Sequence, residues 1–506
     1  MGEIAISTID AFCLSLLREF PLEAGLDPSF RLADETEVAR LVERALDETL
    51  RVARALACQR PDLAYVLTQL TPAQVRDGLR HLIERRAVAL PALGACLARA
   101  DAPATAGDAV RAALEAGLAA IARAAGSVQA WVEDGPHAWP LFAAIAHDVA
   151  QAGGPDANGE AASRRAFDRL RHWFLTQKSE ARRSMPCAQR YYAGRDAFER
   201  HRQALSQAGP EILAIARRLD AQVNAVLARG ILQLARIAES AYCRAMDAED
   251  LLDFTGTLDR AVTLLRQMDE FSRSRFRLES RYQHVLVDEF QDTNRLQWAL
   301  VSLLVEAWGA GEGVAGGPLP PTVFVVGDRK QSIYRFRDAE VALLDEAARH
   351  IAALRPGDRP RRAISASFRS APALLAFVND LFAEVRKAPD RRDAFRYDDT
   401  DRFPMIAAPI ESDGPALGIA SAVGAGELAG VVASEIVRAI ASRETVRDRA
   451  TGVRRPVGPG DIAILFRARD SHRDYERALD ARGVPTYVYK GLGFFAAEET
   501  QDLSAL

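Results

Sequence analysis

The sequence predicts an α/β fold whose sheet is interrupted by a long all-helical block. Two short apolar runs, residues 285–287 and 323–326, are rich in valine and end abruptly in polar residues, as buried strands of a parallel sheet do. Between residues 31 and 280 apolar residues recur at three- and four-residue steps almost throughout, which is the helical period. After Arg361, strand-like and helix-like segments alternate, which favours a second α/β unit.

Length and composition indicate a multi-domain protein without a disulfide framework. The 506 residues allow roughly two to four domains, and 49% are hydrophobic without a long uncharged apolar run, which excludes a membrane-spanning class. The five cysteines are widely spaced, which argues against structural zinc and for a reducing, cytoplasmic location. No secretion signal follows Met1. The net charge of −4 gives no overall basic field, so a nucleic-acid partner needs local basic surface.

The order of these patterns predicts the domain organisation. Residues 1–30 and 281–355 are expected to form one α/β domain, divided by an all-helical insertion over 31–280. Residues 356–506 are expected to form a second α/β domain that is incomplete at its C-terminus.

Local signals predict individual elements within these segments. A helix is expected to begin near Thr8 or Asp10, either a suitable N-cap, and to end at Pro21. Strands are expected at 461–467 and 484–490. Further helices are expected at 37–55, 74–90, 108–125, 211–245 and 251–268, with breaks at Pro61, Pro72, Pro91, Pro186 and Pro210.

The first apolar run ends in two adjacent acids, Asp288 and Glu289, within VLVDEFQDT. Ligands of parallel α/β sheets bind outside the carboxyl ends of the strands. An acid there can hold Mg²⁺, and a second can polarise an attacking water for phosphoryl transfer. Taken alone, a run of this kind is more often a strand that ends in a solvated acidic turn.

The second run continues into GDRKQSIYRFR. Gln331 is a neutral side chain that can hydrogen-bond both a phosphate oxygen and a water. Tyr334 and Phe336 alternate with Arg335 and Arg337, a pattern that suits single-stranded nucleic acid, in which rings stack on bases and cations follow phosphates. The alternative is a strand with buried aromatic rings and exposed arginines.

A third stretch, SASFRS at 365–370, places Phe368 beside Arg369. Arginine grips a terminal phosphate in a planar, two-pronged way, as an arginine finger does during hydrolysis. The neighbouring ring is suited to stacking on a purine base. By itself this short stretch means little.

In this order, the three motifs resemble the superfamily 1 DNA helicases of the UvrD/RecB type, and most closely the RecB/AddA helicase–nuclease branch. STIDAFCLSLLREF near the N-terminus is similar to the family's TIHSFC motif, VLVDEFQDTN to motif II, VVGDRKQSIYRFR to motif III and SASFRS to motif IV. DIAILFRAR and GVPTYVYKGLGFF resemble its second motor domain. The resemblance implies RecA-like motor domains of the P-loop type, the first of them partial, and a helicase that uses ATP and Mg²⁺.

The resemblance also implies a role for individual residues. Asp288 would position Mg²⁺, and Glu289 would activate the hydrolytic water. Gln331 would sense the γ-phosphate, Arg369 would act as the finger and Phe368 would stack on adenine. The residues implied at the DNA are Thr8, Tyr334, Phe336 and Arg337. Family members translocate 3′ to 5′ by closing two RecA-like domains around ATP, and the helicase–nuclease branch works with a second subunit in double-strand-break repair.

The sequence departs from the family pattern in two respects. Asp10 stands where the family has the histidine of TIHSFC, so that DNA contact is not carried over. No GxxxxGK[ST] loop, and no Gly-Lys pair, occurs in the 506 residues, although the family's phosphate-binding loop precedes its TIHSFC motif. Motifs V and VI are expected beyond Leu506. We therefore expect an internal piece of a longer helicase, with no measurable ATPase activity on its own.

Two other functions fit part of the pattern. A non-catalytic, helicase-like DNA-binding scaffold subunit would have no physical need for Asp288, Glu289, Gln331 and Arg369 together. A nucleotide switch without a DNA role would not need alternating tyrosine, phenylalanine and arginine.

Overall fold

The computed structural model of the chain divides into two compact units, Met1–Arg361 and Arg362–Leu506, each of which is described by itself. The predicted site residues Phe336, Arg337, Phe368 and Arg369 lie outside the described residues. The structure describes residues 5–151, 160–267, 274, 278, 281–309, 321–335, 338–354, 360–363, 366–367, 370–385, 397, 399–404, 417–448, 451–467 and 471–488.

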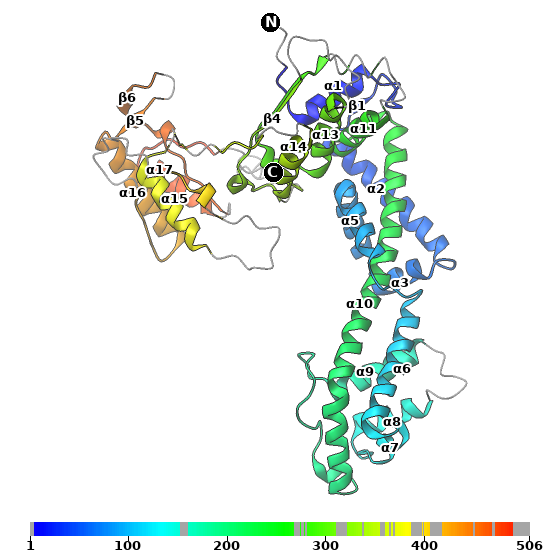
Figure 1. Cartoon of the computed structure of the whole chain (residues 1–506). Coiled ribbons are helices and arrows are strands. Elements are labelled where there is room, and N and C mark those ends of the chain that lie inside the picture. Colours follow the sequence, from blue (N-terminus) through cyan, green and yellow to red (C-terminus); the bar gives the residue numbers. More distant parts are fainter. Residues whose placement is uncertain are drawn as a thin grey trace, which may run out of the picture. The chain divides into compact units, whose positions relative to one another are not determined.

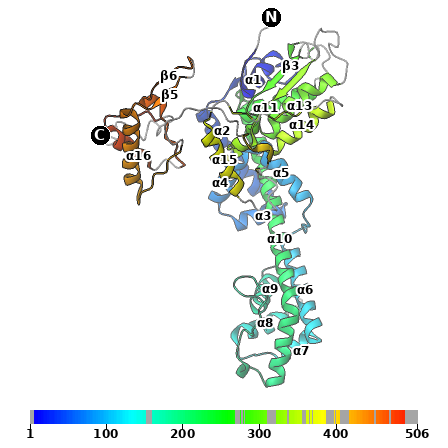
Figure 2. The ribbon, with the colours of Figure 1, turned by 60° about the vertical axis from the view of Figure 1, so that its left-hand side comes forward.

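The predicted pair of parallel strands is confirmed in the first unit. Strand β3 (His284–Val287) pairs in parallel with β4 (Thr322–Val325), with Val287 opposite Val325 (Figures 1 and 2). Each is followed by a turn and a helix, α13 (Arg295–Gly309) after β3 and α14 (Ala342–Leu354) after β4. One face of the pair packs against these helices through Val287, Phe290, Trp298, Val301, Leu343 and Ala347.

The prediction that both strands are fully buried is wrong for one face of this pair. Leu286 is 74% exposed and Phe324, its register partner, is 58% exposed. Successive side chains of a strand point to opposite faces. The valines on the first face are packed, whereas in the described part of the chain the second face is not covered.

A separate core joins the beginning of the chain to residues far along it. Helix α1 (Ile9–Glu19) begins at the predicted N-cap, Thr8, whose hydroxyl accepts a hydrogen bond from the Ala11 N–H at 3.2 Å. Its buried face packs with α11 (Phe254–Gln267) and α13 through Cys13, Leu16, Leu17, Leu258, Ala261, Val262, Leu300 and Leu304. The short strands β1 (Arg31–Leu32) and β2 (Leu251–Leu252) pair in parallel beside this core. Although α11 lies within the predicted insertion, it packs with α1.

The helical block is organised around one 53-residue helix, α10 (Arg195–Asp247), which runs along its whole length (Figures 1 and 2). Its C-terminal half packs against the first four helices of the block, and its N-terminal half packs against the next four. The eight helices are α2 (Glu35–Leu56), α3 (Pro61–Gln69), α4 (Pro72–Glu84), α5 (Arg86–Ala98), α6 (Ala106–Ala125), α7 (Val128–Glu133), α8 (Pro140–Gln151) and α9 (Glu160–Phe174).

Two predicted breaks in the helical block are wrong. Pro91 lies inside α5 and Pro210 lies inside α10. A proline removes one backbone hydrogen bond and disfavours a helix interior. Around Pro210, however, the neighbouring Ala208 and Ile212 are buried, so tertiary packing maintains the helix on both sides. The helix predicted at 74–90 instead divides at Arg85, between α4 and α5.

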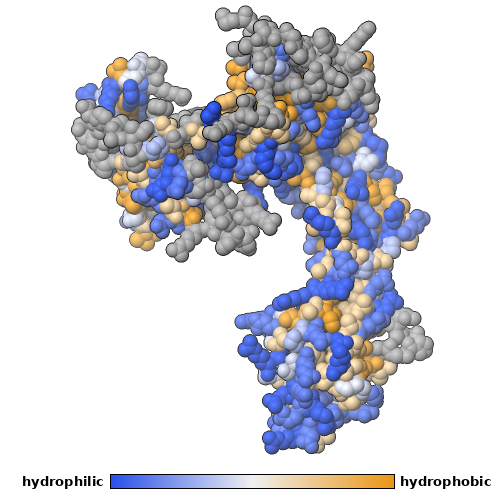
Figure 3. Space-filling view, in the orientation of Figure 1, coloured by the Kyte–Doolittle hydropathy of each residue, from blue (hydrophilic) through white to orange (hydrophobic). Residues whose placement is uncertain are grey.

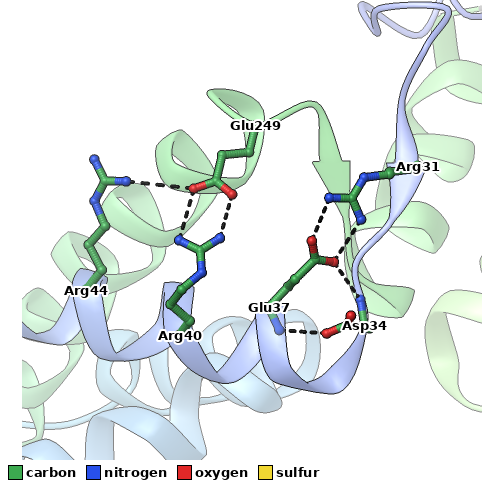
Figure 4. A network of polar contacts seen from close by, with 6 residues as sticks. All are labelled: Arg31, Asp34, Glu37, Arg40, Arg44 and Glu249. Carbon is green, nitrogen blue, oxygen red and sulfur yellow. Dashed lines mark hydrogen bonds and ion pairs between the residues drawn. The ribbon is translucent and has the colours of Figure 1, made fainter.

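An exposed polar network connects the start of α2 to the end of α10 (Figure 4). Glu249 accepts two hydrogen bonds from Arg40, at 3.1 and 2.5 Å, and lies 3.9 Å from Arg44. Glu37 forms a capping box with Asp34 at the start of α2 and also pairs with Arg31. Exposed ion pairs of this kind contribute little to stability, because water screens them.

A buried ion pair connects α5 to the segment before α11. The Arg86 guanidinium, only 7% exposed, donates two hydrogen bonds to the Asp253 carboxylate at 2.8 and 2.6 Å. The Tyr242 hydroxyl and the Gly256 N–H donate to the same carboxylate at 3.0 and 2.6 Å. The carboxylate is therefore surrounded by donors, which compensates for its removal from water.

A buried histidine lies in the aromatic core of the outer part of the helical block. The His201 ring, 1% exposed, stacks on Trp131 with centroids 5.4 Å apart, and its Nε2 donates to the Trp131 carbonyl at 2.8 Å. Its Nδ1 is buried without a hydrogen-bond partner. Burial lowers the pKa of His201 from 6.5 to about 4, because the charged imidazolium is poorly solvated there.

Acidification is therefore expected to destabilise this part of the block. Because His201 binds its proton more weakly in the folded state, stability is full above pH 6.5 and falls as the pH decreases towards 4. At pH 5 the loss should be on the order of 2 kcal/mol. Urea unfolding followed by tryptophan fluorescence at pH 7 and pH 5 measures it. His201→Phe cannot titrate, so its free energy of unfolding should differ less between pH 7 and pH 5. An unchanged difference would show that His201 does not cause the acid sensitivity.

The displayed surface of the outer helical block is mostly hydrophilic, with apolar residues scattered among the polar ones (Figure 3). This agrees with the many arginine–carboxylate pairs on these helices, such as Arg123–Glu211, Arg200–Asp134 and Arg218–Asp101. In the part of the chain that is described, no helix combines the length and apolar character needed to cross a membrane.

The second unit contains predicted helices but not the predicted strands. Its helices are α15 (Pro372–Glu384), α16 (Ala425–Ala441) and α17 (His472–Asp480), and its antiparallel hairpin pairs β5 (Thr445–Arg447) with β6 (Arg454–Pro456). The predictions at 461–467 and 484–490 are wrong for their described residues. Ile462 is extended (φ −112°, ψ 129°), and Ile462, Ile464 and Val484 pack on α16 and α17. Among the described residues no neighbouring strand pairs with either segment, so neither forms a strand there.

Candidate functional site

The candidate site lies at the carboxyl ends of β3 and β4. Asp288 and Glu289 follow β3 directly and are both exposed. Glu289 adopts the left-handed conformation (φ 51°, ψ 40°), which non-glycine residues rarely adopt. The Glu289 N–H donates to the Asp288 carboxylate at 2.9 Å, which stabilises this sharp turn. The chain therefore reverses immediately after the strand and leaves both carboxylates at the edge of the sheet.

The backbone connects the two strand ends beyond the last paired residues. The Val326 N–H donates to the Val287 carbonyl at 2.9 Å, and the Phe290 N–H donates to the Val326 carbonyl at 3.0 Å. Phe290 is fully buried against Trp298, with ring centroids 5.6 Å apart. The turn after β3 is thus fixed both by packing and by hydrogen bonds to the neighbouring strand.

A chain of hydrogen bonds continues from Glu289 to Gln331. The Gln291 Nε2 donates to the Glu289 carboxylate at 2.5 Å, and the Gln291 Oε1 accepts from the Asp328 N–H at 2.9 Å. The Gln331 Nε2 in turn donates to the Asp328 carboxylate at 3.1 Å. Glu289 and Gln331, two predicted site residues that follow different strands, are therefore connected through Gln291 and Asp328, which were not predicted to act there.

Asp328 organises the loop that follows β4. Its carboxylate accepts from the Lys330 N–H at 3.0 Å and lies 3.0 Å from the Lys330 ammonium. Burial alone would raise the pKa of Asp328, but hydrogen bonds from Gln331 and Lys330 outweigh that effect and lower it. The carboxylate therefore stays charged at neutral pH and holds Gln331 close to the strand end.

Gly327 is required where the two strand ends approach each other. A Cβ at this position would lie 2.7 Å from the Gln291 Oε1 and 3.0 Å from its backbone nitrogen. The contact with Oε1 is shorter than real Cβ atoms show, so a larger residue would displace the Gln291 amide. The glycine therefore allows Gln291 to reach Asp328.

Asp292 contributes a further carboxylate behind the two exposed acids. One of its oxygens is buried without a hydrogen-bond partner. Burial, and secondarily the negative charge of Glu289, raises the pKa of Asp292 above its usual value. An unpaired buried acceptor next to a charged carboxylate makes this edge of the sheet attractive to a proton or a cation.

The donor set is suited to a loosely held Mg²⁺ ion. No cluster of three or more His, Cys, Asp or Glu side chains with metal-binding geometry occurs among the residues that the structure describes. Mg²⁺ does not need one, because it commonly takes one or two carboxylates, several waters and the oxygens of a bound phosphate. The exposed carboxylate of Asp288 fits that role.

Of the remaining predicted site residues, the structure describes Tyr334 and Thr8. Tyr334 is half-buried in the loop after β4. Thr8 caps α1, and no hydrogen bond connects it to the described residues at the strand ends. Phe336, Arg337, Phe368 and Arg369 lie outside the described residues, as stated above. Gln291 was visible in the sequence inside VLVDEFQDT, but only the strand register shows that its amide reaches Asp328.

Comparisons with known proteins agree with the resemblance in the motifs. A family model described as the UvrD/REP helicase N-terminal domain matches residues 1–352. The chain is 27% identical, over 98% of its length and 42% of the relative's, to an ATP-dependent helicase/nuclease subunit of Lactobacillus delbrueckii subsp. bulgaricus. It is 28% identical to the protein of the same name in Desulforudis audaxviator, over 99% of the chain and 43% of that protein.

The helicase UvrD1 of Mycobacterium leprae matches a smaller part, with 28% identity over 52% of the chain and 29% of that protein. The chain therefore spans less than half the length of these curated relatives. Because the family model covers more than half of the chain, the chain belongs to the UvrD/REP helicase family.

Proposed function

We propose that this chain supplies the ATP-hydrolysing strand ends and the single-strand-binding loop of an ATP-dependent DNA helicase. The observation that supports this most directly is the hydrogen-bonded chain Glu289–Gln291–Asp328–Gln331. It joins a carboxylate suited to activating water with an amide suited to a phosphate oxygen.

Each site residue has a proposed role in hydrolysis. Asp288 holds Mg²⁺, and Glu289 accepts a proton from the water that attacks the γ-phosphate. Gln331 hydrogen-bonds the γ-phosphate. Arg369 stabilises the charge that develops on the transferred group, and Phe368 stacks on adenine. When bound, ATP would supply the phosphoryl group, and Mg²⁺ would offset the negative charge of the phosphates.

The proposed domain roles follow the order of the chain. Residues 1–30 and 281–355 form part of the first RecA-like motor domain, 31–280 form its helical insertion and 356–506 form part of the second motor domain. Closure of the two motor domains around ATP advances the protein 3′ to 5′ along single-stranded or unwound duplex DNA. The relatives named as helicase/nuclease subunits support a role in double-strand-break repair together with a second subunit.

Stacking by the loop after β4 is tested by single-strand binding. The double substitution Tyr334→Ala and Phe336→Ala removes two rings, each worth on the order of 1–3 kcal/mol on a base. The affinity for an oligothymidine, measured by fluorescence anisotropy at fixed salt, should fall about tenfold or more. Thr8 and Arg337 should contribute less, through the phosphates.

The matched control for this experiment is Tyr65→Ala, which removes a tyrosine from α3 in the helical block. Its affinity should equal that of the unsubstituted chain. Unchanged affinity of the double variant at positions 334 and 336 removes these rings from the DNA path.

A further inference from the structure

Both polar groups of the Gln291 side chain, the NH₂ group and the oxygen, form hydrogen bonds between the two strand ends. Gln291 is 2% exposed, donates to Glu289 at 2.5 Å and accepts from the Asp328 N–H at 2.9 Å. Its backbone carbonyl accepts from the Ser332 hydroxyl at 3.2 Å. A buried amide is costly unless it is hydrogen-bonded, and here both ends of the amide are bonded to groups at the edge of the sheet.

The partners determine the orientation of this amide. A carboxylate only accepts hydrogen bonds and a backbone N–H only donates them, so the NH₂ group must face Glu289 and the oxygen must face Asp328. A rotated amide would place like poles together at both ends. Movement of the Glu289 carboxylate therefore cannot be compensated by a flip of Gln291.

The same residue is attached to the loop after β4 at two positions. Asp328 and Ser332 both bond Gln291, and between them the Gln331 N–H donates to the Asp328 carbonyl at 2.9 Å. Residues 327–335, here named the motif III loop, include Gln331 and Tyr334. The loop therefore takes its position from Gln291 at its beginning and in its middle.

We propose that Gln291 is a positioning residue that couples the Glu289 carboxylate to the motif III loop. When Glu289 turns towards a water or a ligand, the hydrogen bond to Gln291 changes, and the amide transmits that change to Asp328 and Ser332. The proposed function assigns Glu289 to hydrolysis and Tyr334 to DNA, so this inference rests on it. Gln291 touches neither ATP nor DNA and acts only through the residues on either side.

A double-mutant cycle on the 506-residue chain tests the coupling. Glu289→Ala is made with Gln291 present and in the Gln291→Met variant, which keeps the volume but loses both side-chain hydrogen bonds. The readouts are hydrogen exchange of residues 327–335 and the affinity for an oligothymidine at fixed salt. With Gln291 present, Glu289→Ala should change both by about two- to tenfold, the range of one hydrogen bond. With Gln291→Met the same change should have less than a twofold effect.

Two controls separate coupling from general effects. Asp288→Asn removes the same charge one residue away and keeps an oxygen that can accept from the Glu289 N–H, so its effect should be equal in both backgrounds. Gln297→Met changes a glutamine on α13 that caps Asn294 and should leave the effect of Glu289→Ala intact. A merely structural role for Gln291 would alter the loop by the same factor in both backgrounds and give an additive cycle.

Additive effects, or no effect of Glu289→Ala on the loop in either background, would overturn the coupling. Failure of the DNA assignment is recognised separately, because Tyr334→Ala would then leave the affinity unchanged while loop exchange still reports on Gln291. If Gln291→Met does not fold, Gln291→Asn replaces it, since the shorter amide cannot reach Glu289 and Asp328 together.

Discussion

Glu289→Gln is expected to reduce DNA-stimulated ATP hydrolysis by about 10²- to 10⁴-fold, the usual contribution of a general base. The amide keeps the shape of the side chain and its place beside Gln291, but it cannot accept the proton of the attacking water. The assay uses a fusion with segments of a UvrD/REP relative. They supply a Gly-x-x-x-x-Gly-Lys-Thr loop before residue 5 and motifs V and VI after residue 506. The 506-residue chain itself contains no Gly-Lys pair and serves as the blank.

The control for this experiment is Glu346→Gln, which neutralises an exposed carboxylate on α14 that lies 3.3 Å from Arg295. This variant should retain the rate of the unsubstituted fusion. Folding of Glu289→Gln is checked by its unchanged affinity for single-stranded DNA. A fusion that keeps its full hydrolysis rate after Glu289→Gln would remove this residue from the chemistry.

Arg86→Ala is expected to lower the free energy of unfolding of the first unit by about 3–5 kcal/mol, because it leaves Asp253 as a buried, uncompensated carboxylate. Urea denaturation at pH 7 measures the change. Burial alone would raise the pKa of Asp253, yet the pairing with Arg86 lowers it. The stabilisation by this pair is therefore present above pH 4 and is lost as the pH falls through the lowered folded-state pKa.

Two further variants test whether an uncompensated buried charge explains the lower stability of Arg86→Ala. The double variant Arg86→Met with Asp253→Leu removes both charges and should recover part of the stability, because no uncompensated charge stays buried. The remainder stays lost, because the Tyr242 hydroxyl and the Gly256 N–H lose their acceptor. Arg40→Ala removes a pair whose arginine side chain is 52% exposed and should shift the midpoint of urea unfolding far less than Arg86→Ala does. Equal losses in Arg86→Ala and Arg40→Ala would show that burial does not determine the effect.

The sequence was sufficient wherever a local signal decides the structure. The helix cap at Thr8 and the parallel strands at 285–287 and 323–326 were predicted from patterns within about fifteen residues. The sequence also indicates that Asp288 and Gln331 follow strands ending at the same edge of the sheet, because the carboxyl ends of neighbouring parallel strands share one edge.

Other features depend on contacts between distant segments and were not predictable. Pro210 is tolerated because buried residues on both sides hold α10 together, whereas a local rule predicts a break. The helical period of α11 does not reveal that it packs with α1 rather than with α10. The segment 461–467 is a short apolar run typical of a strand, but whether a strand forms depends on a paired neighbour. The role of Gln291 required the register of β3 and β4.

The most direct test of the proposed nucleotide site is to locate Mg²⁺ by cleavage of the backbone. Fe²⁺ replaces Mg²⁺ in the fusion with ATP bound, and radicals generated with ascorbate and peroxide cut the chain close to the metal. We predict cuts in two separate stretches, near residues 287–290 and near 327–331, both lost in Asp288→Asn. Cuts confined to one of these stretches, or located elsewhere in the chain, would show that the two strand ends do not form one nucleotide site.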